Sequence, residues 1–282
     1  MCEFHSGIVT MKRVFTDLDT DSHSDLLEKY HIKDDFKEAN FVKVELVPTN
    51  KPVHEAILTP TDKEWTLRVD QSDYPDWWES SKKWAKKEML KSLKNVIKKR
   101  CVLAGQAVKE IKDGERWVIV CGNVDYVYGS ATINDVCDLA TINDVCGSAT
   151  INDVRGSATI KNVYGSATIK NVYDSATIND VRGSATINDV RDSATINDVC
   201  GSATINDVYG SATINDVYGS ATINDVCGSA TINDVRDSAT IKKITYKAIV
   251  IYRYNGVLKI RTGEEYTKIE HTIGGTENEA KI

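Results

Sequence analysis

The chain has 282 residues, with 35 Lys or Arg against 41 Asp or Glu, and a formal net charge of −6 at pH 7. This length has room for two modest domains. No apolar run approaches the roughly eighteen residues of a membrane-spanning helix, and the first residues hold no secretory signal. The seven cysteines include no C-x-x-C pair, so we expect free thiols in a reducing, cytoplasmic compartment.

Residues 1–115 predict a small α+β domain. Alternating apolar residues indicate strands, and apolar residues at helical spacing indicate helices. The strands are expected at 41–47 and 65–69, a short helix is expected near Ser24, and a long helix is expected over 77–100, capped by Asp76. Four tryptophans lie in these segments, and at this spacing they are expected in the core rather than on a sugar or base platform.

The long helix carries many lysines and few acids. Phosphate groups, nucleic acid or an acidic partner are candidate ligands for such a face, whereas the simplest interpretation is a solvated surface. The candidate partner-binding residues on it are Lys83, Lys87, Lys91 and Lys94.

Acidic residues between Asp17 and Glu28 fall at calcium-loop positions, although Ser22 stands where such a loop needs glycine. These acids and serines are more readily explained as caps of the helix that follows. The histidines pair with no Cys or carboxylate at ligand spacing. The sequence therefore predicts no metal site and no cofactor.

Residues 129–245 consist of thirteen nine-residue units of the form G-S-A-T-I-N-D-V-x. Such short-period self-similarity predicts a β-solenoid. Ala131 and Ile133 alternate with Ser130 and Thr132, which indicates a strand with an apolar inner face. We expect the pair Asn134-Asp135 to form the turn.

The variable ninth position predicts the size of one coil. With two units in each 18-residue coil no Arg lies above another Arg, and cation–π stacking between neighbouring Arg and Tyr becomes available. The five expected pairs are Arg155–Tyr173, Tyr164–Arg182, Tyr173–Arg191, Arg191–Tyr209 and Tyr218–Arg236.

The expected solenoid domain covers 116–262, with both ends capped because open sheet edges aggregate. Arg116–Tyr128 is the expected amino-terminal cap. Tyr246–Arg261 is the expected carboxyl-terminal cap, a hairpin with Asn255-Gly256 at its turn. Residues 263–282 are expected to form a flexible polar tail.

The repeats carry the acidity of the chain. They hold 14 Asp against 4 Lys and 4 Arg, so their net charge is 8 − 14 = −6, which argues against nucleic acid as their partner. Stacked coils place like carboxylates one above another. The candidate partner-binding acids are Asp135, Asp153, Asp189, Asp207 and Asp225.

The segments 19–30, 41–50 and 65–78, together with the repeats, resemble an uncharacterised family of phage- and prophage-associated proteins. In that family a domain with the pattern W…VD…P-x-W precedes nonapeptides of the form G-N-S-x-V-N-x-M-x. The resemblance covers most of the chain. It departs in the repeat, which has Ala, Ile and Val where the family often has Ser, Val and Met. It implies this architecture and a mobile-element origin, and it implies no activity.

No nucleophile, phosphate-binding or metalloprotease motif occurs, so we expect no enzyme. A recurring surface suits binding, and we predict a non-catalytic scaffold or binding protein with a protein partner. One alternative is an acidic decoy that mimics nucleic-acid charge and binds a basic host protein. A weaker alternative is an ice-binding solenoid that uses its outward Ser and Thr rows.

Overall fold

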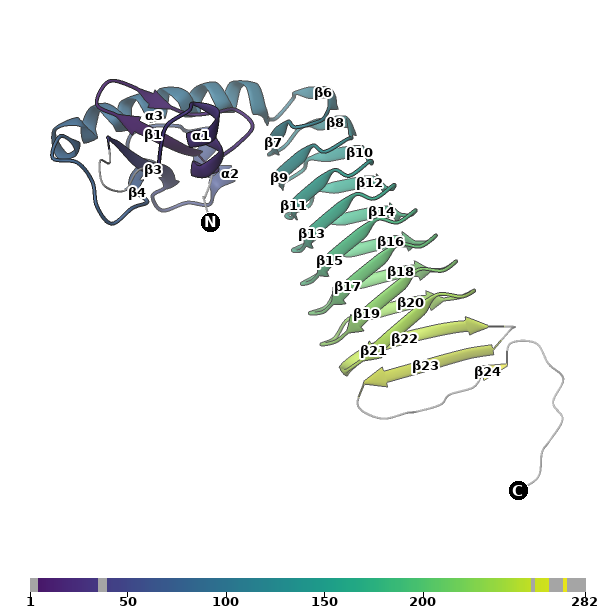
Figure 1. Ribbon diagram of the computed structural model, residues 1–282. Helices are drawn as coiled ribbons and strands as arrows, with labels where there is room; N and C mark the ends of the chain where they lie inside the picture. Colours follow the sequence, from purple (N-terminus) through teal and green to yellow (C-terminus); the bar gives the residue numbers. More distant parts are fainter. Residues whose placement is uncertain (1–4, 35–39, 255–256, 264–270, 273–282) are drawn as a thin grey trace, which may run out of the picture. The chain divides into compact units, whose positions relative to one another are not determined.

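The computed structural model describes residues 5–34, 40–254, 257–263 and 271–272. The chain divides into two units, Met1–Cys101 and Val102–Ile282. Figure 1 labels the helices and strands of both units and colours them in chain order. Within the described residues, no helix combines the length and the hydrophobicity needed to cross a membrane.

The amino-terminal unit contains a four-stranded antiparallel sheet. Its strands are β1 (His5–Thr10), β2 (Val14–Phe15), β3 (Phe41–Pro48) and β4 (Trp65–Val69), in the order β2-β1-β3-β4. The two predicted strands, at 41–47 and 65–69, are therefore confirmed as β3 and β4, whereas β1 and β2 were not predicted.

The described residues of this unit form three helices: α1 (His23–Lys29), α2 (Val53–Leu58) and α3 (Trp78–Arg100). The Ser22 hydroxyl accepts a hydrogen bond from the backbone N–H of Asp25, which caps α1 as predicted. The predicted cap of the long helix is wrong. Trp77 rather than Asp76 occupies the N-cap of α3, and no side chain caps it.

The two faces of the sheet are covered by different helices. A Cβ added to Gly7 in β1 would lie 2.5 Å from the sulfur of Met89 in α3, so any larger residue there would force the Met89 side chain to move. On the α1 side, Ile8 and Phe41 pack against Leu26 and Leu27. Trp65 and Trp78 are fully buried, as expected for the core, whereas Trp77 and Trp84 are only partly buried.

The solenoid begins earlier than the predicted boundary between residues 115 and 116. It includes β5 (Cys101–Val102), β6 (Ala107–Ile111), β7 (Arg116–Ile119) and β8 (Asn123–Val127). These strands join the parallel ladders of the repeats, with β6 on β8, β8 on β10 and β7 on β9. The expected cap at Arg116–Tyr128 is therefore one coil of the solenoid, formed by β7 and β8, that lacks the repeat sequence.

Each of the thirteen units forms one five-residue strand. The strands are β9 (Thr132–Val136), β10 (Thr141–Val145), β11 (Thr150–Val154), β12 (Thr159–Val163), β13 (Thr168–Val172), β14 (Thr177–Val181), β15 (Thr186–Val190), β16 (Thr195–Val199), β17 (Thr204–Val208), β18 (Thr213–Val217), β19 (Thr222–Val226), β20 (Thr231–Val235) and β21 (Thr240–Ile244).

Successive strands alternate between two parallel sheets, and every strand pairs with the one two units away. Thr132 lies opposite Thr150, and Thr141 lies opposite Thr159, which is a displacement of 18 residues. The two-unit coil is therefore confirmed. Among the described residues, one sheet has nine strands and the other has eleven.

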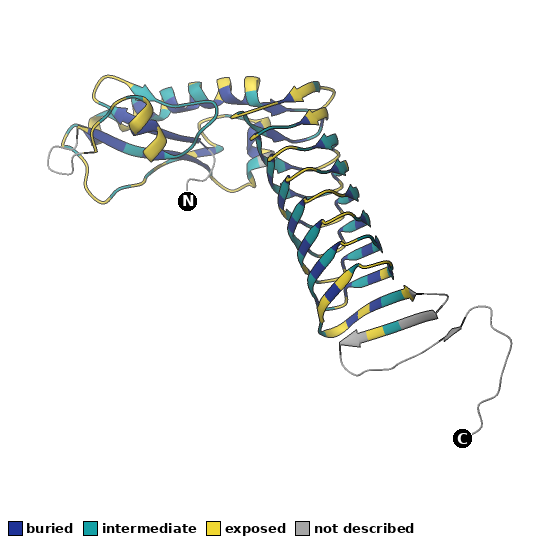
Figure 2. Cartoon of the chain, turned by 45° about the vertical axis from the view of Figure 1, so that its right-hand side comes forward, coloured by how far each residue is buried: buried dark blue, intermediate teal, exposed yellow. Residues whose placement is uncertain are grey.

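Ala, Ile and Val fill the interior between the sheets. In the first unit, Ala131, Ile133 and Val136 are all 0% exposed. Figure 2 shows the same buried positions recurring in coil after coil. One nonapeptide has too few apolar side chains for a core, whereas stacked nonapeptides form a continuous one.

The turn lies in a different place from the one predicted. Asn134 and Asp135 are within β9, with partly exposed side chains. The chain instead turns at the first residue of each unit, where Gly129 has φ +65° and Asp138 has φ +54°. Glycine tolerates this left-handed conformation, and aspartate tolerates it better than most residues.

Substitutions at the turn position test whether aspartate is tolerated there better than alanine. A Cβ added to Gly183, at φ +69°, would lie 3.1 Å from the backbone nitrogen of Gly165. We expect Gly183→Ala to destabilise the solenoid by about 1–2 kcal/mol. We expect Gly183→Asp to lose less, because Asp174 at the equivalent position accepts a hydrogen bond from the Gly156 N–H (3.1 Å). Chemical denaturation of both variants measures the difference, and equal stabilities would contradict it.

The carboxyl-terminal end has the expected hairpin. β22 (Tyr246–Tyr254) extends the eleven-stranded sheet parallel to β20, and β23 (Val257–Gly263) pairs antiparallel with β22. β24 (His271–Thr272) pairs with β23. The predicted turn at Asn255-Gly256, and the rest of the predicted tail at 264–270 and 273–282, lie outside the described residues.

Candidate functional site

All five predicted acids lie in one row along the nine-stranded sheet. Successive members of the row are paired in register, from coil to coil. Asn171 interrupts the row once, and Lys243 follows its last acid. The row reads Asp135, Asp153, Asn171, Asp189, Asp207, Asp225 and Lys243. An equivalent row on the other sheet, which contains Asp180, Asp198, Asp216 and Asp234, was not singled out from the sequence.

The ends of the predicted row have counter-charges. Arg155 donates to Asp135 (Nε to Oδ1, 2.8 Å), and Lys243 forms an ion pair with Asp225. In the middle of the row, burial and then the charges of Asp189 and Asp225 raise the pKa of Asp207. The row therefore holds its central carboxylates close together in spite of their mutual repulsion.

Asparagine ladders run beside both acidic rows. Where asparagines occupy this position in successive coils, the amide nitrogen donates to the amide oxygen one coil earlier, for example from Asn206 to Asn188 (3.1 Å) and from Asn224 to Asn206 (2.8 Å). The other sheet has the same bonds, from Asn197 to Asn179 and from Asn215 to Asn197. This arrangement explains why the pair Asn-Asp stays in the strand: its amide bonds to neighbouring coils rather than to its own backbone.

The predicted Arg–Tyr stacking at the ninth positions is confirmed in part. Three of the five expected Arg–Tyr pairs are in contact: Arg182 over Tyr164 (5.3 Å), Arg191 over Tyr173 (4.6 Å) and Arg236 over Tyr218 (4.8 Å). Arg155 donates its Nε to the carboxylate of Asp135 in the coil before it.

The second acidic row gives a pH-dependent prediction. Burial, and then Asp180 and Asp216, raise the pKa of Asp198 above its ordinary value of 3.8. The folded state therefore binds this proton more tightly than the unfolded state. Protonation of Asp198 therefore stabilises the folded state fully at pH values below 3.8, the ordinary pKa that applies in the unfolded chain. This stabilisation is lost as the pH rises through the folded-state pKa.

We expect Asp198→Asn to raise the melting temperature at pH 7, and this gain to shrink as the pH falls towards 4. Asn162 already occupies the equivalent position in the same row, where its amide donates a hydrogen bond to Asp144 in the coil before (2.9 Å), so an asparagine fits there. Thermal melts at several pH values measure the effect, with the turn variant Asp192→Asn as the charge-matched control. A gain that does not change with pH would contradict the ionised Asp198 carboxylate as its cause.

The four predicted lysines lie on one side of α3. Lys83, Lys87, Lys91 and Lys94 all line an open groove of about 980 Å³, together with the apolar side chain of Leu67 from β4. Lys91 lies 3.8 Å from Glu88, whereas the other three form no ion pair with the described residues. The lysine stripe is therefore a second charged surface, on the amino-terminal unit.

The acids near α1 have protein partners. Lys29 forms an ion pair with Asp17, and Arg100 forms one with Asp19 (2.7 Å). Together with the Ser22 cap, these bonds support the structural interpretation of the segment over the calcium loop.

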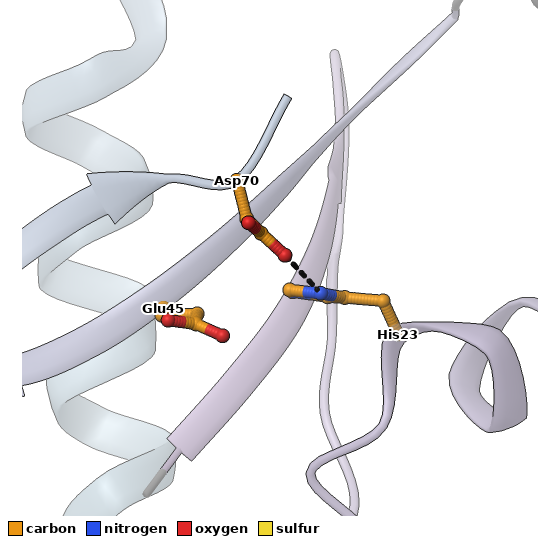
Figure 3. A group of neighbouring side chains, drawn as sticks. All are labelled: His23, Glu45 and Asp70. Atoms are coloured by element: carbon orange, nitrogen blue, oxygen red, sulfur yellow. Dashed lines mark ion pairs between the residues drawn. The ribbon is translucent and has the colours of Figure 1, made fainter. Parts of the chain in front are cut away.

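One cluster was missed in the sequence. His23 at the start of α1, Glu45 in β3 and Asp70 just after β4 bring one nitrogen and two carboxylate oxygens within 4.8 Å of one another (Figure 3). The Nδ1 atom of His23 lies 3.1 Å from Oδ2 of Asp70. The three residues are more than twenty positions apart in the chain, so no spacing motif indicates them. Glu45 shares β3 with a second charged residue, Lys43, and alternates with apolar neighbours as a solvent-facing residue does, so its place in this cluster had no signal in the sequence.

Comparison with known proteins assigns no family to the chain. No family model matches it, and neither the curated proteins nor the solved structures contain a match. The resemblance to phage-associated proteins therefore stays a prediction. The acidic rows, the lysine stripe and the His23 cluster are the features from which function is inferred.

Proposed function

We propose that this protein is a non-catalytic scaffold or binding protein whose solenoid presents a row of carboxylates to a basic protein partner. The observation that supports this proposal is the in-register row Asp189, Asp207 and Asp225, in which burial and the neighbouring acids raise the pKa of Asp207. A cationic partner stabilises the charged form of these side chains.

Electrostatic repulsion between neighbouring carboxylates of the row favours a partner that contacts several coils at once. Neighbouring charges at the roughly 4.8 Å spacing of strands repel by about 0.9 kcal/mol in water, and by more where they are partly buried. Basic groups on a partner relieve this repulsion at several coils together. Weak single contacts then add to a usable affinity.

The test compares two triple variants of the full chain in pull-downs from the native host. Asp189→Asn with Asp207→Asn and Asp225→Asn removes the central row. The matched control, Asp138→Asn with Asp174→Asn and Asp192→Asn, removes three turn charges. We expect salt-sensitive partners to be lost only by the first variant. Equal loss from both would reduce the effect to net charge, and no loss from either would refute the proposal.

A decoy that mimics nucleic-acid charge is the second candidate, because the repeats carry the whole net charge of −6. It predicts that the captured partner is a nucleic-acid-binding protein and that duplex DNA competes with the solenoid for it. The ice-binding alternative has less support, because Ser130 lies in the turn and only Thr132 lies on the strand.

The mobile-element origin and the cytoplasmic location remain our expectations. The six described cysteines are free, as they are in most proteins of reducing compartments. On the amino-terminal unit, the lysine stripe is the candidate surface for attachment to an acidic partner or to nucleic acid.

A further inference from the structure

We propose that His23, Glu45 and Asp70 bind a divalent transition-metal ion in the amino-terminal unit. This site is separate from the solenoid surface, and it does not depend on the function proposed for that surface. Four features of the cluster carry the proposal.

The first feature is the convergence of ligand atoms. One imidazole nitrogen and two carboxylate oxygens lie within 4.8 Å of one another. Two ligands at roughly 2.1 Å from one ion are at most about 4.2 Å apart, so a side-chain shift of about half an ångström completes the set. In Figure 3 the Glu45 carboxylate and the His23 ring lie next to each other, with Asp70 paired to the ring nitrogen.

The second feature is the orientation of the His23 ring. Its Nε2 lies 3.0 Å from the carbonyl oxygen of Val44, and because a carbonyl only accepts, Nε2 carries the hydrogen. Metal-binding histidines are commonly held in this way by a backbone carbonyl, which leaves the other nitrogen for the ion. Here that other nitrogen is Nδ1, the atom that faces Asp70.

The third feature is the isolation of Glu45. It is only 4% exposed, and it forms no hydrogen bond or ion pair with another described residue. Its register partner on β1 is Ser6, which is 1% exposed and whose buried hydroxyl has no hydrogen-bond partner among the described residues. Burial makes an ionised carboxylate costly, and a metal ion held by Glu45 together with His23 and Asp70 would offset that cost.

The fourth feature is access. The side chain of Asp70 is 56% exposed, whereas that of His23 is 7% exposed. One side of the cluster is therefore open to water, which supplies an entry path and the remaining ligands of the ion. Imidazole together with carboxylates suits first-row transition metals such as Mn²⁺, Fe²⁺ and Zn²⁺.

Calorimetric titration of the metal-free full chain with Mn²⁺ tests the proposal. Mn²⁺ prefers oxygen ligands and avoids the cysteine thiols. We expect one saturable site per chain, weakened at least about tenfold by Glu45→Gln and by Asp70→Asn. The matched control Asp73→Asn removes an exposed carboxylate three residues beyond Asp70 and should bind like the wild type.

Melting curves separate lost binding from lost folding. Without metal, Glu45→Gln should melt at or above the wild-type temperature, because it removes a buried charge. Mn²⁺ should raise the melting temperature of the wild type and leave that of Glu45→Gln unchanged. Equal Mn²⁺ binding by wild type and Glu45→Gln would assign the ion to the solenoid acids. No saturable binding would reduce the cluster to a His23–Asp70 ion pair. Either result overturns the proposal.

Discussion

Replacing Ile187 with alanine is expected to lower the free energy of unfolding of the solenoid by about 2–5 kcal/mol. Ile187 lies in β15, is 0% exposed, and stacks in register between Ile169 and Ile205. The backbone hydrogen bonds of the two neighbouring coils hold their spacing, so the interior has little freedom to close around the cavity. The loss should therefore lie towards the upper part of this range.

Denaturant titration followed by circular dichroism measures this loss. The control is Thr186→Ala, which shortens the adjacent outward side chain and should change stability by no more than about 0.5 kcal/mol. Because coils contact only their neighbours, hydrogen exchange should increase most in the coils around β15. Similar losses for the two variants would contradict an interior filled by Ala, Ile and Val.

The solenoid was predicted well from the sequence because the same pattern of inward and outward residues recurs in every unit. A residue pattern that is too weak to decide the fold of one unit becomes informative over thirteen units, and the Arg and Tyr positions favoured an 18-residue coil over the alternatives. Arg191 over Tyr173 and Arg236 over Tyr218 are among the contacts that this reasoning requires. Two of the four strands of the amino-terminal sheet, β3 and β4, were also predicted from their alternating residues, whereas β1 and β2 were not.

The turn was misplaced because local preference and stacking compete. Asn134 and Asp135 favour turns when considered singly, and so does the glycine that begins each unit. In the stack, an asparagine in the strand gains an amide bond to each neighbouring coil, as Asn206 does with Asn188 and Asn224. Those bonds exist only between coils, so a single unit does not reveal them.

Two further features were outside the reach of pattern reasoning. The first coils keep little of the repeat beyond buried positions such as Val124 and Val127, which align with Ile142 and Val145. The His23, Glu45 and Asp70 cluster depends on the fold of the sheet and α1, which brings together residues that are distant in sequence. The first coils and the His23 cluster both depend on contacts between residues far apart in the chain, which a spacing pattern in the sequence does not reveal.

The open edge of the nine-stranded sheet leads to a second prediction, which concerns self-association of the protein. β21 is the last strand of that sheet and pairs with β19 on one side only, among the described residues. In β21 the usual Asn-Asp is replaced by Lys242 and Lys243, and lysines on an edge strand oppose pairing with another chain. We therefore expect Lys242→Thr with Lys243→Val to convert the protein to larger, concentration-dependent assemblies.

Sedimentation velocity over a range of protein concentrations detects this change. The control is Lys161→Thr with Lys170→Thr, which removes the same two charges from β12 and β13, strands that are paired on both sides. If loss of charge alone drove association, both variants would assemble alike. If the exposed edge is the cause, only the β21 variant should assemble, since the interior strands have no free backbone groups to offer a second chain.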